Sequence, residues 1–183
     1  MNKHLSIILF LLIFSINSSG QINSLSIGIA GGIGNMKGNS PTQTSFILIG
    51  FVELSPSFWN EVDFRFDYSY TRKLEYLFPD NNPKRYYPTM QAFSLKIIFR
   101  QLLSKVFLLE EGLGPLALND RSYSDINEWD YGVSGWFAIG LDLKSVNYLP
   151  LVISVGSHFG LTVTNTTASF NTYCIQTQYF FLN

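Results

Sequence analysis

Residues 62–70 read V-D-F-R-F-D-Y-S-Y, and this strict alternation decides the fold. Successive side chains of a β-strand point to opposite faces, whereas a helix would spread the two kinds of residue around its circumference. The segment is therefore predicted to be a strand with an apolar face and a polar face. The apolar face consists of Val62, Phe64, Phe66, Tyr68 and Tyr70, and the polar face of Asp63, Arg65, Asp67 and Ser69.

The same two-residue period recurs along the chain and predicts eight strands. Their ranges are 25–36, 44–54, 61–72, 89–100, 106–117, 131–144, 151–164 and 171–183. The connections alternate between a short set and a set that includes two long loops. This pattern is typical of an all-β, eight-stranded, antiparallel up-and-down transmembrane β-barrel, with short periplasmic turns and longer extracellular loops. An even strand number then places both termini in the periplasm.

Alternation alone does not say which face is inside, because a soluble lipocalin-type barrel shows the same period with the apolar face inward. Charged residues make up 14% of the chain, against roughly 25% in soluble domains. A soluble exterior would carry abundant Lys and Glu, but the polar faces here are mostly Gly, Ser, Ala and Thr. A lipid-facing exterior is therefore favoured, and a soluble lipocalin-like ligand-binding barrel remains the alternative.

The N-terminus has the pattern of a secretory signal peptide. Lys3 precedes the apolar run 5–16, and Ser18, Ser19 and Gly20 supply small residues at the cleavage positions. We predict a signal peptide over 1–20 and a single barrel domain over 21–183. Cys174 is the only cysteine, so no intramolecular disulfide is expected. The formal charge of −1 gives no reason to expect a nucleic-acid partner.

Several of these segments resemble the small outer-membrane barrel proteins of Gram-negative bacteria, the OmpA/OmpX-type and "outer membrane protein beta-barrel domain" group. They are the signal peptide, the glycine-rich run 28–34, the run G-W-F-A-I-G-L at 135–141 and the aromatic last strand. The resemblance covers the whole mature chain. It implies an outer-membrane location and contact with outer-membrane lipid and lipopolysaccharide. It specifies an architecture, not an activity.

The polar faces of the predicted strands carry charges that would meet inside the barrel. The interior of an eight-stranded barrel is only wide enough for side chains, and an unpaired buried charge is costly. We therefore predict a polar network that closes the lumen, in which Arg65 bonds an inward acid; an ion path through the same residues is the alternative. The network comprises Glu53, Asp63, Arg65, Asp67, Lys96, Arg100, Asp142, Lys144 and His158.

His158 raises a second alternative, because some barrels of this size are lipid A acyl hydrolases that use a His/Ser/acid arrangement. Their pattern requires a serine two residues after the histidine, where this chain has Gly160. Ser157 should face away from His158, since strand neighbours point to opposite sides. We therefore predict no enzyme activity, no catalytic or metal-binding residue and no cofactor.

Glu110 and Glu111 are adjacent, so a regular strand must direct one of them toward lipid. The favoured interpretation is a β-bulge near 110–115 that turns both inward. In the alternative, the two acids mark a face that contacts another outer-membrane protein. The protein would then be an accessory subunit of a larger outer-membrane assembly.

The two long predicted loops have opposite charge, and solvated loops that pair across the barrel mouth are the favoured interpretation. Alternatives are phosphate contact with lipopolysaccharide on the basic side and a weak divalent-cation site on the acidic side. The basic residues are Arg72, Lys73, Lys84 and Arg85, and the acidic residues are Asp120, Asp125, Glu128 and Asp130.

Overall fold

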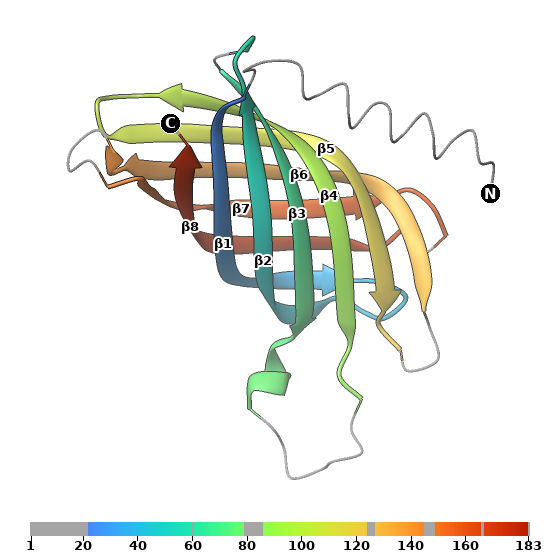
Figure 1. The fold of residues 1–183 in the computed structure, drawn as a ribbon. Coiled ribbons are helices and arrows are strands. Elements are labelled where there is room, and N and C mark those ends of the chain that lie inside the picture. Colours follow the sequence, from blue (N-terminus) through green and yellow to red (C-terminus); the bar gives the residue numbers. More distant parts are fainter. Residues whose placement is uncertain are drawn as a thin grey trace, which may run out of the picture.

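The computed structural model describes residues 22–59, 61–78, 86–123, 127–144, 149–165 and 167–182. Eight strands form one closed barrel (Figure 1). They are β1 Ile22–Lys37, β2 Gln43–Pro56, β3 Val62–Lys73, β4 Thr89–Leu102, β5 Phe107–Arg121, β6 Glu128–Asp142, β7 Leu151–Thr162 and β8 Ser169–Leu182. A short 3₁₀ helix, η1 (Leu74–Leu77), follows β3.

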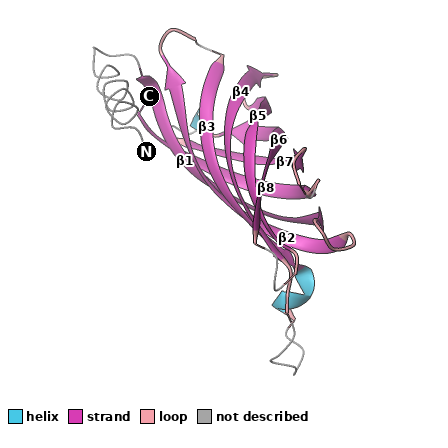
Figure 2. Ribbon diagram, turned by 90° about the vertical axis from the view of Figure 1, so that its right-hand side faces the viewer, coloured by secondary structure: helices cyan, strands magenta, loops and turns pink. Residues whose placement is uncertain are grey.

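Each strand pairs antiparallel with the next in sequence, and β8 pairs with β1 to close the sheet. The predicted all-β, eight-stranded up-and-down barrel is therefore confirmed. Ile22, Leu182 and the shorter turns lie at one rim, which we call the terminus end. The connection carrying η1 lies at the opposite rim, the loop end, where Figure 2 shows the helix in cyan. No helix among the described residues is long and apolar enough to span a membrane.

Most strands are longer than the sequence predicted, and the difference matters most on β5 and β6. β5 extends to Arg121 and β6 begins at Glu128, so much of the predicted loop 118–130 is paired sheet, as in the pair Asn119 and Trp129. Polar residues had interrupted the alternation there, but cross-strand pairing continues through them. The predicted signal peptide, together with Lys84, Arg85 and Asp125, lies outside the described residues.

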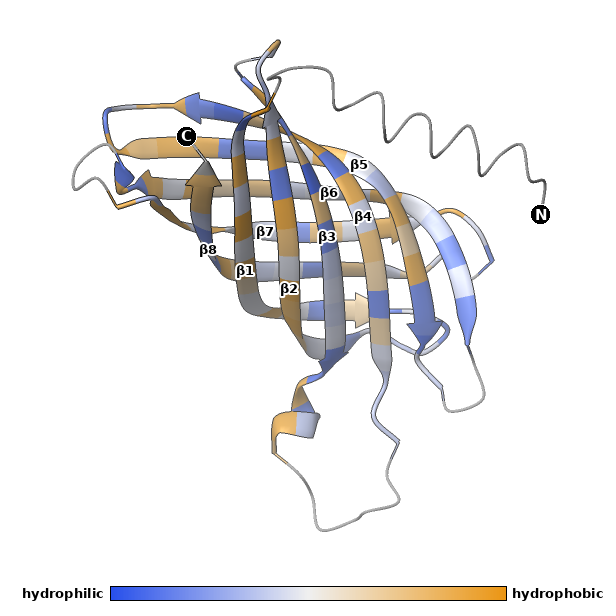
Figure 3. Cartoon of the chain, viewed as in Figure 1, coloured by the Kyte–Doolittle hydropathy of each residue, from blue (hydrophilic) through white to orange (hydrophobic). Residues whose placement is uncertain are grey.

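The barrel turns its apolar face outward. On β3, Arg65 is 3% exposed whereas its neighbour Phe66 is 52% exposed, and Figure 3 shows hydrophobic and hydrophilic residues alternating along the strands. This is the reverse of a lipocalin, which hides its apolar face inside.

Two glycines let neighbouring strands approach closely. A Cβ at Gly32 would collide with the backbone of Tyr173 on β8, and a Cβ at Gly114 would collide with the carbonyl of Leu95 on β4. Glycine is the residue that permits such backbone approach in a strand. Gly32 thus helps to explain why the glycine-rich first strand fits a narrow barrel.

Candidate functional site: the barrel interior

Five charged residues meet inside the terminus-side half of the barrel, and we call them the charged cluster. They come from four consecutive strands, and all except Arg100 are at least 95% buried. Each occupies an inward position in the alternation of its strand, so the two-residue period brings them together. The cluster consists of Glu53 of β2, Asp63 and Arg65 of β3, Arg100 of β4 and Glu110 of β5.

Arg65 lies at the centre of this cluster. Its Nε donates to Glu53 Oε2 at 2.8 Å and its Nη2 donates to Glu110 Oε2 at 3.4 Å. Its Nη1 donates to Gln176 Oε1 at 3.0 Å, and its guanidinium lies 4.2 Å from the ring centroid of Phe51. The prediction that Arg65 bonds an inward acid is confirmed.

Arg100 approaches the same carboxylates from the terminus end. It donates to Asp63 and Glu53 at 2.8 Å each and to Glu110 at 2.7 Å. Its side chain is 18% exposed, so it forms the outer edge of the cluster. Two guanidinium groups thus bind three carboxylates, and fork-shaped arginines suit this role because each offers several donors in one plane.

Glu110 connects the two arginines to neutral donors. Its Oε2 accepts from Trp136 Nε1 and from Gln176 Nε2, both at 3.1 Å. Four different side chains therefore donate to this one carboxylate. A buried carboxylate is tolerated where its lone pairs are satisfied in this way.

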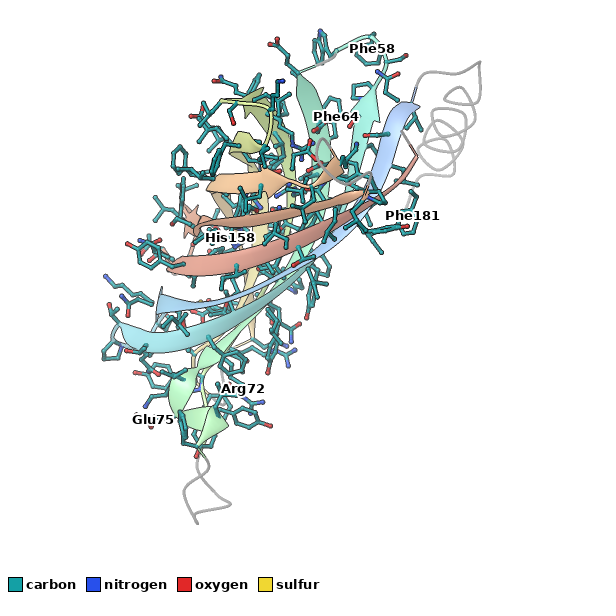
Figure 4. All side chains as sticks on the ribbon, turned by 90° about the vertical axis from the view of Figure 1, so that its left-hand side faces the viewer. Phe58, Phe64, Arg72, Glu75, His158 and Phe181 are labelled. Atoms are coloured by element: carbon teal, nitrogen blue, oxygen red, sulfur yellow. The ribbon has the colours of Figure 1, made fainter. Side chains whose placement is uncertain are left out.

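A second polar group lies nearer the middle of the barrel. Lys96 Nζ contacts Asp67 Oδ2 at 2.5 Å and Ser94 Oγ at 2.6 Å. It also lies 3.2 Å from His158 Nε2, while His158 Nδ1 has no partner among the described residues. Figure 4 labels His158 about midway along the barrel. A cavity of about 10 Å³ borders this group, which is room for roughly one water molecule.

The loop-side half of the interior is filled mainly by hydrocarbon. Its apolar side chains are at most 3% exposed and belong to one contiguous core. We call them the apolar cluster: Met36, Ile47, Met90, Leu116, Leu118 and Phe170. Asp120 and Asp130, which the sequence had placed in a solvated loop, are buried strand residues near the mouth of this half. Asp120 accepts a hydrogen bond from the backbone N–H of Asn39, which ties the β1–β2 connection to β5.

The other predicted network residues also lie on inner positions. Asp67, Lys96 and His158 are buried, whereas Asp142 and Lys144 are half-buried at the terminus end. Lys144 Nζ lies 4.2 Å from the ring centroid of Phe180.

The predicted bulge near Glu110 is wrong. The pairing of β5 keeps one register with no shift, in which Glu110 lies opposite Arg100 and Ala138, and Glu111 lies opposite Phe99 and Phe137. Glu110 is fully buried, so it cannot belong to a partner face, and Glu111 is exposed on the outer wall. The reason is that Arg100 on the neighbouring β4 and Arg65 on β3 already offer Glu110 an inward place in a regular strand.

Sequence reasoning missed Trp136, Gln176 and Gln178 as members of the interior network. Gln178 Nε2 donates to Glu53 Oε1 at 2.5 Å and to Ser26 Oγ at 2.7 Å. The signal was present in the alternation of β8, where Gln176 and Gln178 share a face opposite Ile175 and Tyr179.

His158 does not form a nucleophile pair with Ser157. His158 points inward and contacts Lys96, as predicted, whereas the Ser157 hydroxyl lies on the outer wall and contacts Asn171 Oδ1 at 3.1 Å. In the described part of the chain, no three His, Cys, Asp or Glu side chains gather as metal ligands.

Solved structures identify the class of this fold. Neisserial surface protein A superposes with a TM-score of 0.61 at 8% identity, covering 85% of this chain and 96% of that one. Ail, the attachment invasion locus protein of Yersinia pestis, gives 0.51 at 14% identity, covering 87% and 99%. Ail in complex with the heparin analogue sucrose octasulfate also gives 0.51, at 13% identity, covering 88% and 100%. No family profile matches the sequence, and no curated protein matches it.

At these identities the likeness shows the fold. The chain has the fold of the small eight-stranded outer-membrane barrels, as the resemblance in its sequence implied.

Proposed function

We propose that the protein is an integral barrel of the Gram-negative outer membrane, with a closed lumen and no enzyme activity. Its termini face the periplasm and its loops face the outside. It acts as a structural element or as an accessory subunit of a larger outer-membrane assembly. The observation that carries this proposal is a set of buried inward side chains at successive levels of the barrel, beneath an apolar outer wall.

The outer wall supports membrane insertion. Large apolar side chains such as Leu95, Val155 and Ile175 are more than half exposed. Aromatic residues lie near the terminus end, with Trp59 and Phe58 both more than half exposed in the β2–β3 turn. An apolar band flanked by aromatic girdles is characteristic of outer-membrane barrels.

The interior supports closure by successive layers. Leu108, Val152 and Phe180 form a small apolar group on the terminus side. The charged cluster, the Lys96 group and the apolar cluster follow toward the loop end. A hydrated ion would have to break buried ion pairs and then cross hydrocarbon, both of which are costly.

Planar-bilayer recording tests the closed lumen. We expect the wild-type barrel to show no steady conductance at moderate voltage, while the same preparation shows the heat-dependent gel mobility of a folded barrel. A stable ohmic channel from folded protein would contradict the proposal.

Topology can be tested with introduced cysteines, because Cys174 is buried and gives little background. Asn127→Cys at the loop end and Lys105→Cys in the β4–β5 turn are both at exposed positions. An impermeant thiol reagent on intact cells should label the first and not the second. Labelling of Lys105→Cys alone would show that the barrel has the opposite orientation in the membrane.

Glu111 favours the accessory-subunit role over a purely structural one. Its carboxylate is exposed on the outer wall between Phe99 and Phe137. Hydrocarbon gives a carboxylate no solvation, so acids on a lipid-facing surface are costly and mark functional positions. A neighbouring outer-membrane protein that supplies a hydrogen-bond donor would remove this cost.

A native gel of mildly solubilised membranes tests this partner face. Glu111→Leu should release the barrel from a larger complex to its monomer position. Gln101→Leu is a matched control, because Gln101 is exposed two residue pairs closer to the terminus end, opposite Leu109. If the complex survives Glu111→Leu, the proposal that strand β5 contacts the partner protein is wrong.

A further inference from the structure

A groove crosses the outer wall of the barrel over β8, β1, β2 and β3. It has a volume of about 680 Å³ and is almost entirely apolar. Its floor is formed by two outward glycines, Gly31 on β1 and Gly50 on β2. They are diagonal neighbours across the strand pair, because Gly31 lies opposite Leu48 and Gly50 lies opposite Ile29. Its walls include Ile29, Leu48, Tyr68, Tyr70 and Ile175.

Barrel packing does not require glycine at either position. A Cβ at Gly50 would meet nothing within 4 Å, and a Cβ at Gly31 would make ordinary contact with Leu48 at 3.7 Å. At Gly32 and Gly114, by contrast, a Cβ would collide with the backbone of the next strand. Glycine inside a strand weakens it, so the chain keeps a hollow here that its own fold does not need.

A cation lies at the loop end of this groove. Arg72 follows Tyr70 on the same face of β3, about 7 Å further along the strand. Its Nη1 donates to the Tyr70 hydroxyl at 3.3 Å, and its guanidinium lies 3.3 Å from the ring centroid of Tyr76. Its Nε is buried and has no hydrogen-bond partner among the described residues, and no ion pair among them includes Arg72. Figure 4 labels Arg72 and Glu75 together at this end of the barrel.

A second, more polar hollow of about 450 Å³ lies beyond Arg72. Lys73 and Glu75 line it and form an ion pair at 3.1 Å. The rest of its lining is Thr42, Gln43, Thr44, Leu74 and Phe78. The wall therefore presents an apolar groove, a guanidinium that makes no ion pair among the described residues and a partly polar pocket, in that order from mid-barrel toward the loop end.

We propose that this surface binds the lipid A portion of lipopolysaccharide. An acyl chain lies in the groove over Gly31 and Gly50, a phosphate accepts hydrogen bonds from Arg72, and the sugar to which it is attached occupies the polar pocket. A glycerophospholipid would satisfy the first two contacts but not the third. The inference rests on the proposed function, because it requires the loop end to face the lipopolysaccharide leaflet.

Native mass spectrometry of the detergent-solubilised barrel tests the site with lipid A, phosphatidylglycerol and phosphatidylcholine as separate probes. We expect the wild type to retain lipid A in preference to both phospholipids. Gly50→Leu fills the groove and should weaken lipid A retention about tenfold, since two or more methylene contacts are lost. Ala117→Leu, which enlarges an outward side chain on β5 on another part of the wall, is the matched control and should retain lipid A like the wild type.

Arg72→Gln provides an independent arm, because it leaves the groove intact. It should reduce the preference for lipid A over phosphatidylcholine. The site is overturned if Gly50→Leu and wild type retain lipid A equally, if Ala117→Leu loses as much as Gly50→Leu, or if phosphatidylglycerol is retained as well as lipid A. Heat-dependent gel mobility and the absence of conductance in the same variants separate these outcomes from a failure of the proposed closed barrel.

Discussion

The two halves of the barrel interior are filled by different kinds of contact, although the same strands line both. On the terminus side, Glu53, Arg65 and Glu110 are held by directional bonds of 2.6–3.4 Å. On the loop side, Leu118 and Met90 are equally buried but make no polar contact. The first kind of filling needs the right atoms at the right distance, whereas the second needs mainly volume. Closure is therefore exacting in one half of the barrel and tolerant in the other.

The largest expected effect comes from breaking the charged half. Glu110→Gln replaces one carboxylate oxygen, which accepts from buried donors, with an NH₂ group that faces them. A buried donor left without an acceptor costs about 1–3 kcal/mol, and more when it is charged, so several such losses together make this the largest effect. Urea unfolding in detergent micelles, followed by tryptophan fluorescence, measures the loss. Glu111→Gln is the matched control on the outer wall, and its effect should stay within about 0.5 kcal/mol. Equal losses in the two variants would show that Glu110 does not hold the cluster together.

A smaller loss is expected in the apolar half. Leu118→Ala deletes a fully buried side chain, which costs about 2–5 kcal/mol in protein cores. We expect the lower end of this range, because Met36 and Met90 belong to the same cluster and flexible methionines fill irregular gaps. The same unfolding assay applies, with Leu161→Ala on the outer wall as control. A loss as large as that of Glu110→Gln would contradict the tolerance of this half.

The smallest net change is expected where the two halves meet. Asp67→Leu combined with Lys96→Met replaces a buried ion pair by hydrocarbon, and such replacements are often neutral or stabilising. Each single substitution should destabilise the barrel, because it leaves one charge buried alone. A double-mutant cycle measures the coupling between the two positions. If the double variant loses as much unfolding free energy as the two single variants together, hydrocarbon cannot replace the ion pair in the middle of the barrel.

The sequence by itself determined the architecture and the two faces of most strands. Where one face is apolar and the other small or polar, as in residues 62–70, a shift of one residue would reverse every side chain, so the pattern fixes which side faces lipid. The inward positions of Arg65, Lys96 and His158 followed from this alternation. Strand ends were less well determined, because the pairing of Asn119 with Trp129 depends on the neighbouring strand and not on local pattern.

Only the tertiary structure decided the position of Glu110, the arrangement of the network and the groove. On β5 both faces carry leucine, so alternation could not tell Glu110 from Glu111; Arg65 and Arg100, on other strands, decide it. Gln176 joins the network across a separation of 66 residues from Glu110. The groove likewise arises where Gly31 and Gly50 become diagonal neighbours through strand register. Contacts between strands depend on register and barrel closure, and a one-dimensional pattern does not contain those distances.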